Sequence, residues 1–203
     1  MKVLIGCEES QIVCQAFRDR GHEAYSCDLE STRGNPDWHF QQDVMTLLTH
    51  EQKWDLIILH PDCTAMAVSG NRWYGQNMPL HAKRIAAVEW TLNLWIKAVE
   101  VCHRVVIENP KSVIFPVLRK YMAITQYVQP SMFGHTENKE TGFALHGLPE
   151  LTPTNDVSGL MKTMSKAETD RVHRMPPGPN RKRDRSVTYQ GIADAMADQW
   201  GKL

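Results

Sequence analysis

Short apolar runs alternate with longer amphipathic stretches through the first two thirds of the chain. Four of these runs have the length and composition of strands buried in a sheet: residues 3–5, 23–27, 54–59 and 104–107. Between them, apolar residues recur at helical spacing in residues 11–20 and 81–101. Strands that alternate with helices predict an α/β fold, with a mostly parallel sheet and helices on both faces.

The alternation weakens after Pro110. Residues 126–128 and 142–145 are strand-like, and residues 191–200 predict a closing helix. Residues 152–185 show no periodicity, and the Pro-Gly tract 175–179 within them is expected to form loop. We predict one domain, residues 1–203, with a reduced loop region at about 147–184.

Polar residues that can carry chemistry follow the predicted strands directly. Cys7 and Asp28 follow the first two strands, Cys63 lies in a Pro-Asp loop after the third, and Glu108 follows the fourth. Ligands of such sheets bind at the carboxyl ends of the strands. A thiol and a carboxylate placed there predict a nucleophile and an acid acting on one substrate, unless Glu108 serves only a structural salt bridge.

Composition narrows the possible classes of protein. Basic and acidic residues number 23 each, so a nucleic-acid surface would need local clustering rather than net charge. The five cysteines form no C-x-x-C pair, which predicts reduced intracellular thiols and no metal site. Met1 leads directly into the first strand, and no apolar run approaches the roughly 20 residues of a membrane span. We therefore expect a cytoplasmic protein without a membrane partner.

Two loops carry a resemblance to a known family. Pro61-Asp62-Cys63 resembles the nucleophile loop of cytosine-C5 DNA methyltransferases, and Glu108-Asn109-Pro110 resembles their Glu-Asn motif. Weaker blocks at 42–44, 137–143 and 185–200 follow in the family's order. The chain is thus similar to short phage and prophage members that lack a large target-recognition domain. This resemblance implies the Rossmann-like fold of class I methyltransferases and S-adenosyl-L-methionine as cofactor.

The resemblance also implies a reaction. Cys63 would add to carbon 6 of a pyrimidine, and Glu108 would stabilise the charge that develops on the ring edge. Carbon 5 would then accept the methyl group. Because a base inside a duplex is out of reach, the partner would be single-stranded DNA or a duplex from which the base is flipped.

The cofactor site expected from the resemblance lies mainly at the strand ends. No glycine follows Gly6 in the loop where family members are glycine-rich. Ser10 is also a plausible helix cap, and Asp43 an ordinary N-cap. Asp28 is placed to bind the ribose hydroxyls, and Asp43 the adenine amino group. The full set of expected cofactor residues is Cys7, Glu8, Glu9, Ser10, Asp28, Asp43, His60 and Ser186.

Substrate contacts are expected from both loops and from the basic carboxyl-terminal third. In the block that resembles the family's Gln-x-Arg-x-Arg, Lys139 and Thr141 stand where arginines are usual. Basic residues cluster between 171 and 185, in a segment that is either a phosphate-binding surface or a solvated face. The expected substrate-binding residues are Asp62, Asn109, Lys139, Thr141, Arg174, Arg183 and Arg185.

Three other functions remain open from the sequence. A methyltransferase of exocyclic amino groups would use the His60–Cys63 loop without needing the thiol. The short recognition region also fits an enzyme of free nucleotides. A non-catalytic nucleic-acid-binding or decoy protein would explain the altered cofactor loop and Thr141.

Overall fold

A seven-stranded sheet forms the centre of the computed structural model, which describes residues 1–203. The strand order is β3-β2-β1-β4-β5-β7-β6. The first five strands pair in parallel, whereas β7 is antiparallel to both of its neighbours. The strands are β1 (Lys2–Gly6), β2 (Glu23–Asp28), β3 (His39–Gln41), β4 (Leu56–Leu59), β5 (Val105–Pro110), β6 (Ile124–Val128) and β7 (Thr141–His146).

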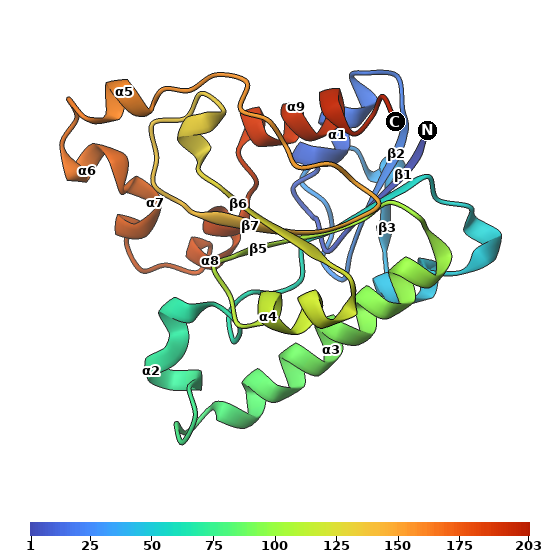
Figure 1. The fold of residues 1–203 in the computed structure, drawn as a ribbon, viewed down its shortest axis with the longest axis horizontal. Helices are drawn as coiled ribbons and strands as arrows, with labels where there is room; N and C mark the ends of the chain where they lie inside the picture. The colour runs from blue at the N-terminus through green and yellow to red at the C-terminus, as the bar shows by residue number, and fades with distance from the viewer.

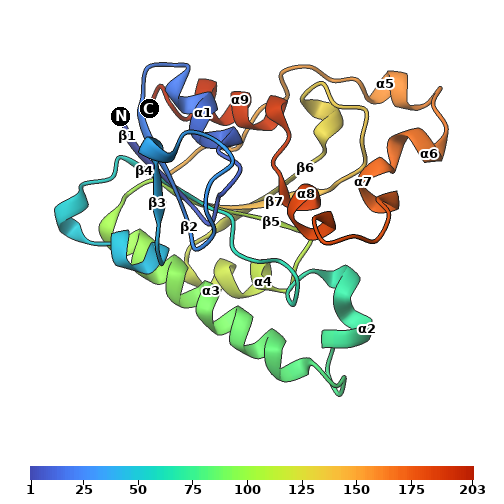
Figure 2. The same cartoon turned by 180° about the vertical axis from the view of Figure 1, so that it is seen from behind.

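Helices cover both faces of this sheet (Figures 1 and 2). The helices are α1 (Ile12–Arg18), α2 (Asn71–Tyr74), α3 (His81–Val101), α4 (Ile114–Leu118), α5 (Ser158–Met161), α6 (Lys166–Thr169), α7 (Arg171–Arg174), α8 (Arg181–Ser186) and α9 (Gln190–Gln199). Helices α1 and α9 lie on one face, and α3 and α4 lie on the other.

The alternating side chains of the strands build a separate core on each face. Val3 and Ile5 of β1 pack with the residues of α1 and α9, whereas Leu4 between them packs with those of α3 and α4. This alternation is the period-two geometry of a strand with both faces buried. Fully buried Trp200 and Trp95 close the two cores.

The predicted α/β fold is confirmed, including the mostly parallel sheet with helices on both faces. This strand order, with one reversed strand beside the edge, is the Rossmann-like arrangement that the resemblance implied. The predicted helix over 81–101 is α3, and the closing helix is α9, one residue earlier than expected at each end. No helix is both long and apolar enough to cross a membrane.

The loop expected at residues 175–179 is confirmed. The aperiodic residues around it, 152–186, also contain four short helices, α5 to α8, each of only four to six residues. Helices of this length have no room for a repeating apolar face, so hydrophobic periodicity could not detect them. One of them, α6, carries a local signal in the capping box formed by Ser165 and Glu168.

Candidate active site

Register places four of the expected residues in one row along the sheet edge. Gly6 pairs with both Cys27 and Leu59, and Leu59 pairs with Ile107. The residues that directly follow Gly6, Cys27, Leu59 and Ile107 therefore lie side by side at the carboxyl edge of the sheet. Read across the sheet, the row is Asp28, Cys7, His60 and Glu108.

The loop after β4 carries Cys63 to this edge. Asp62 Oδ1 accepts hydrogen bonds from the backbone N–H and the hydroxyl of Thr64, which forms a tight turn around the cysteine. Asn109 Nδ2 donates to the Pro61 carbonyl at 2.9 Å and joins this loop to the end of β5. The Cys63 side chain is neither sealed in the core nor fully exposed.

Buried Arg84 of α3 holds the following part of the same loop. Its guanidinium donates to the carbonyls of Ala65 and Ala67 at 2.6 and 3.2 Å and to Asn71 Oδ1 at 2.8 Å. These bonds are charge-assisted, because the donor is a guanidinium. Sequence reasoning missed Arg84, because an arginine on a helical pattern normally faces solvent.

Cys63 and Glu108 lie close enough to influence each other. Burial and the negative charges of Glu108 and Asp62 raise the pKa of the Cys63 thiol, while Lys139 acts in the opposite direction. The expected thiol and carboxylate thus share one electrostatic environment. The thiol is mostly protonated at rest, and a bound substrate or a nearby cation has to favour its ionisation.

Lys139 approaches this pair from the segment before β7. Burial lowers the pKa of Lys139, against the opposing influence of Glu108 and Cys63. Its Nζ donates to the Val187 carbonyl at 3.1 Å and lies 5.4 Å from the centre of the Tyr189 ring. Thr141 is buried and donates to the Lys139 carbonyl, so of the two residues only Lys139 presents a charge near the cysteine.

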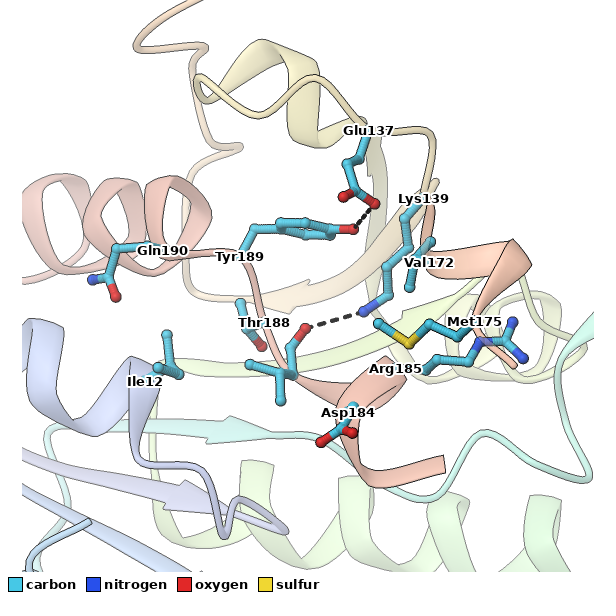
Figure 3. Close-up of a pocket in the computed structure, with 11 residues that line it drawn as sticks. Ile12, Glu137, Lys139, Val172, Met175, Asp184, Arg185, Thr188, Tyr189 and Gln190 are labelled. Carbon is cyan, nitrogen blue, oxygen red and sulfur yellow. Dashed lines mark hydrogen bonds between the residues drawn. The ribbon is translucent and has the colours of Figure 1, made fainter. Parts of the chain in front are cut away.

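A cavity of about 320 Å³ lies beside Lys139 (Figure 3). On one wall the Tyr189 hydroxyl donates to Glu137, whose other oxygen accepts from Arg171. Lys139 and Arg185 supply positive charge to the lining, and Ile12 marks its end nearest α1. The cavity therefore lies between the segment before β7, the start of α1 and the segment before α9.

The loop after β1 forms its sharp turns without glycine. Cys7 and Gln11 both adopt left-handed backbone conformations, with φ of 60°. Such conformations are normally taken by glycine, so this loop makes two glycine-like turns with other residues. The Gln11 side chain offsets the strain, because it hydrogen-bonds Ser26 and the backbone N–H and carbonyl of Asn35.

Glu8 performs the capping role expected of Ser10. Its carboxylate accepts from the backbone N–H groups of Val13 and Cys14 at 2.8 and 3.2 Å, inside the first turn of α1. The Ser10 hydroxyl lies 3.4 Å from the Ile12 nitrogen, at the long limit of a hydrogen bond. Sequence rules did not identify Glu8, because glutamate is not among the preferred N-cap residues.

The residues at this edge fit the charge of S-adenosylmethionine. Burial raises the pKa of the Cys7 thiol, and the carboxylates of Asp28, Asp43 and Asp62 raise it further, which shows that these acids surround it. Asp28 and Asp43 each use one oxygen in a local turn, and the second oxygen has no partner within the chain. Carboxylates with free acceptor oxygens at this sheet edge suit a sulfonium cation with ribose hydroxyls and an adenine amino group.

The alternative prediction for Asp43, that it is the N-cap of a helix, is confirmed. Its side chain accepts from the Met45 N–H at the start of the 3-10 helix Val44–Leu47. The cap uses Oδ1 alone, so it does not exclude a cofactor contact through Oδ2.

The basic helix α8 is held by acidic residues of the site. Arg183 pairs with Glu9 at 3.0 Å, and Lys182 pairs with Asp62 at 2.9 Å. Glu9 also binds Arg33 from the loop after β2. Helix α8 therefore bridges the β1 loop and the Cys63 loop, a role that its sequence did not indicate.

The other expected contacts lie at the margin of this site. Arg174 is exposed at the end of α7, and the exposed Ser186 donates to the Arg183 carbonyl. Arg185 is half-buried and lines the cavity. The structure thus brings Cys63, Glu108, His60 and Lys139 together and leaves Arg174 and Ser186 outside the group.

Comparisons with known proteins give distant similarities only. No family model and no curated protein matches the sequence. Among solved structures, the chain is similar to a protein described as a DNA modification methyltransferase encoded within a prophage of E. coli, at 12% identity and a TM-score of 0.49 over 76% of this chain and 51% of that one. It is also similar to the S. pombe Dnmt2 methyltransferase, at 12% identity and a TM-score of 0.47 over 85% of this chain and 59% of that one.

The chain therefore spans between about half and three fifths of these two solved proteins. Its fold is established by its own sheet order and register rather than by these similarities.

Proposed function

We propose that this chain is an S-adenosylmethionine-dependent methyltransferase that modifies a pyrimidine in DNA at carbon 5, cytosine being the favoured base, through covalent addition of Cys63. The observation that carries the proposal is the meeting of a thiol, a carboxylate and an ammonium group at the carboxyl edge of the sheet. These are the groups that a nucleophilic attack on a pyrimidine ring requires.

The chain's residues would divide the reaction between them. Cys63 Sγ forms a bond to carbon 6, and the electron pair released from the ring double bond is stabilised by a proton from Glu108. Lys139 favours the thiolate, because it is the nearby cation that opposes the raised pKa of Cys63. The cofactor would supply a methyl group on a sulfonium ion, which carbon 5 can accept once the ring is activated. Water would take the hydrogen that carbon 5 then loses as Cys63 is eliminated.

Covalent trapping tests this proposal directly. The chain should form a denaturation-resistant adduct with an oligonucleotide containing 5-fluorocytosine when S-adenosylmethionine is present. Cys63→Ser should abolish the adduct and turnover, whereas Cys102→Ser, at a buried cysteine directly after α3, should retain both.

Other outcomes separate the alternatives. Methylation that survives in Cys63→Ser would indicate an exocyclic amino methyltransferase instead. Adduct formation with the free nucleotide and not with DNA would place the substrate outside nucleic acid. DNA binding without calorimetric binding of S-adenosylmethionine would indicate a non-catalytic protein.

A further inference from the structure

One histidine of the site is enclosed by acidic groups. His60 Nδ1 lies 3.3 Å from Glu108 Oε2, and both side chains are only 11% exposed. Glu8, which is also buried, lies close enough for its charge to act on the imidazole. The second ring nitrogen, Nε2, is buried and has no hydrogen-bond partner.

This arrangement is costly for a purely structural residue. A buried polar nitrogen without a partner destabilises a folded protein, and nearly all such groups in native structures are paired. An apolar side chain at position 60 would fill the same space without that cost. An unpaired group in a native structure calls for an explanation, and a chemical role for His60 is one.

The charged groups facing His60 work in opposite directions. Burial lowers the pKa of the imidazole and Lys139 lowers it as well, whereas the hydrogen bond and charge of Glu108 and the charge of Glu8 raise it. The net result is a raised pKa. His60 therefore retains a proton to higher pH than an ordinary histidine, next to the carboxylate that our proposed reaction uses as an acid.

We infer that His60 is a positioning residue that holds the proton for Glu108 and restores it during the reaction. The Cys63 thiol loses its proton to water and its sulfur forms a bond to carbon 6, while the electron pair of the carbon 5–carbon 6 double bond moves toward ring nitrogen 3. Glu108 passes the proton of His60 Nδ1 to nitrogen 3, which leaves His60 neutral. When carbon 5 loses its hydrogen to water and Cys63 is eliminated, nitrogen 3 returns its proton through Glu108 to His60. This inference rests on the proposed function.

Exchange of the hydrogen on carbon 5 tests the inference without the cofactor. Addition of Cys63 alone makes carbon 5 basic, so DNA with tritium at this position should release it to water. His60→Gln keeps a hydrogen-bonding side chain that cannot titrate, and we expect it to slow this release about tenfold near neutral pH. It should also remove the pH dependence due to the imidazole. His50→Gln, at an exposed histidine, is the matched control and should behave as the original protein.

Nitrogen NMR of the unmodified chain and of Glu108→Gln gives a second measurement that needs no turnover. We expect a proton on Nδ1, a His60 pKa above its ordinary value, and a fall in that pKa when Glu108 is made neutral. The inference is overturned if the His60 pKa does not respond to Glu108→Gln, or if His60→Gln leaves the rate and pH profile of tritium release unchanged. Absence of both release and trapping in the unmodified chain, with the NMR coupling intact, would instead overturn the proposed function and the inference with it.

Discussion

Removal of the Glu8 carboxylate should destabilise the fold, because this side chain accepts two backbone hydrogen bonds at the start of α1. Glu8→Ala leaves the backbone N–H groups of Val13 and Cys14 buried without an acceptor. Each N–H group that loses its acceptor lowers the free energy of unfolding by about 1–3 kcal/mol. Part of this loss is offset, because the variant no longer buries a charged carboxylate. We expect a net loss of about 2–4 kcal/mol, which for a domain of this size lowers Tm by roughly 4–16 °C.

Ser10→Ala is the matched control. The hydroxyl of Ser10 makes two long contacts, 3.4 Å from the Ile12 nitrogen and 3.3 Å from Glu8 Oε1, and Glu8 keeps both backbone partners without it, so its loss should cost less than about 0.5 kcal/mol. Both variants would be measured by urea unfolding followed by circular dichroism, with equal m-values required for the comparison. Surface substitutions usually change the free energy of unfolding by no more than about 0.5 kcal/mol. A change of that size or less in Glu8→Ala would refute the capping role.

The same carboxylate makes stability depend on pH. Burial raises the pKa of Glu8, although its contacts with His60 and the backbone N–H groups act in the opposite direction. Between the unfolded value of 4.5 and the raised folded value, the folded chain binds more protons than the unfolded chain. The contribution of Glu8 is therefore largest below pH 4.5 and falls as pH rises through the folded pKa. Glu8→Gln should flatten this part of the profile, and an unchanged slope would contradict the reasoning.

Three further predictions concern the loops around the site. Arg84→Met should lower the free energy of unfolding by about 3 kcal/mol, because three hydrogen bonds to the loop that follows Cys63 are lost. It should also slow formation of the covalent adduct with 5-fluorocytosine DNA, and an unchanged rate would contradict this. A double-mutant cycle on Lys182 and Asp62 should give a coupling free energy of only about 0.2–1 kcal/mol that weakens with salt, because the ion pair is largely exposed. A larger coupling that salt does not change would contradict this. Gly191→Ala should lower Tm measurably by calorimetry, because its new methyl group would lie 1.9 Å from the Phe133 carbonyl oxygen; an unchanged Tm would show that this contact relaxes freely.

Local sequence was enough to predict the strands that carry the site and the polar residues at their ends. The buried runs before His60 and Glu108 read as strands because they are apolar on both faces, and α3 could be predicted because it is long enough to show its period. Parallel strands place their carboxyl ends at one edge, so the proximity of Cys63 and Glu108 was predictable in outline.

The pairings between residues far apart in the chain could not be predicted from local sequence. The His60–Glu108 contact spans 48 residues, the Lys182–Asp62 pair spans 120 and the Arg183–Glu9 pair spans 174. Such pairings depend on strand order, on the reversed direction of β7 and on loop paths, none of which leaves a periodic trace in the sequence. Local sequence therefore places the chemical groups at the sheet edge, whereas the packing of distant segments sets their hydrogen-bond partners and shifts their pKa values.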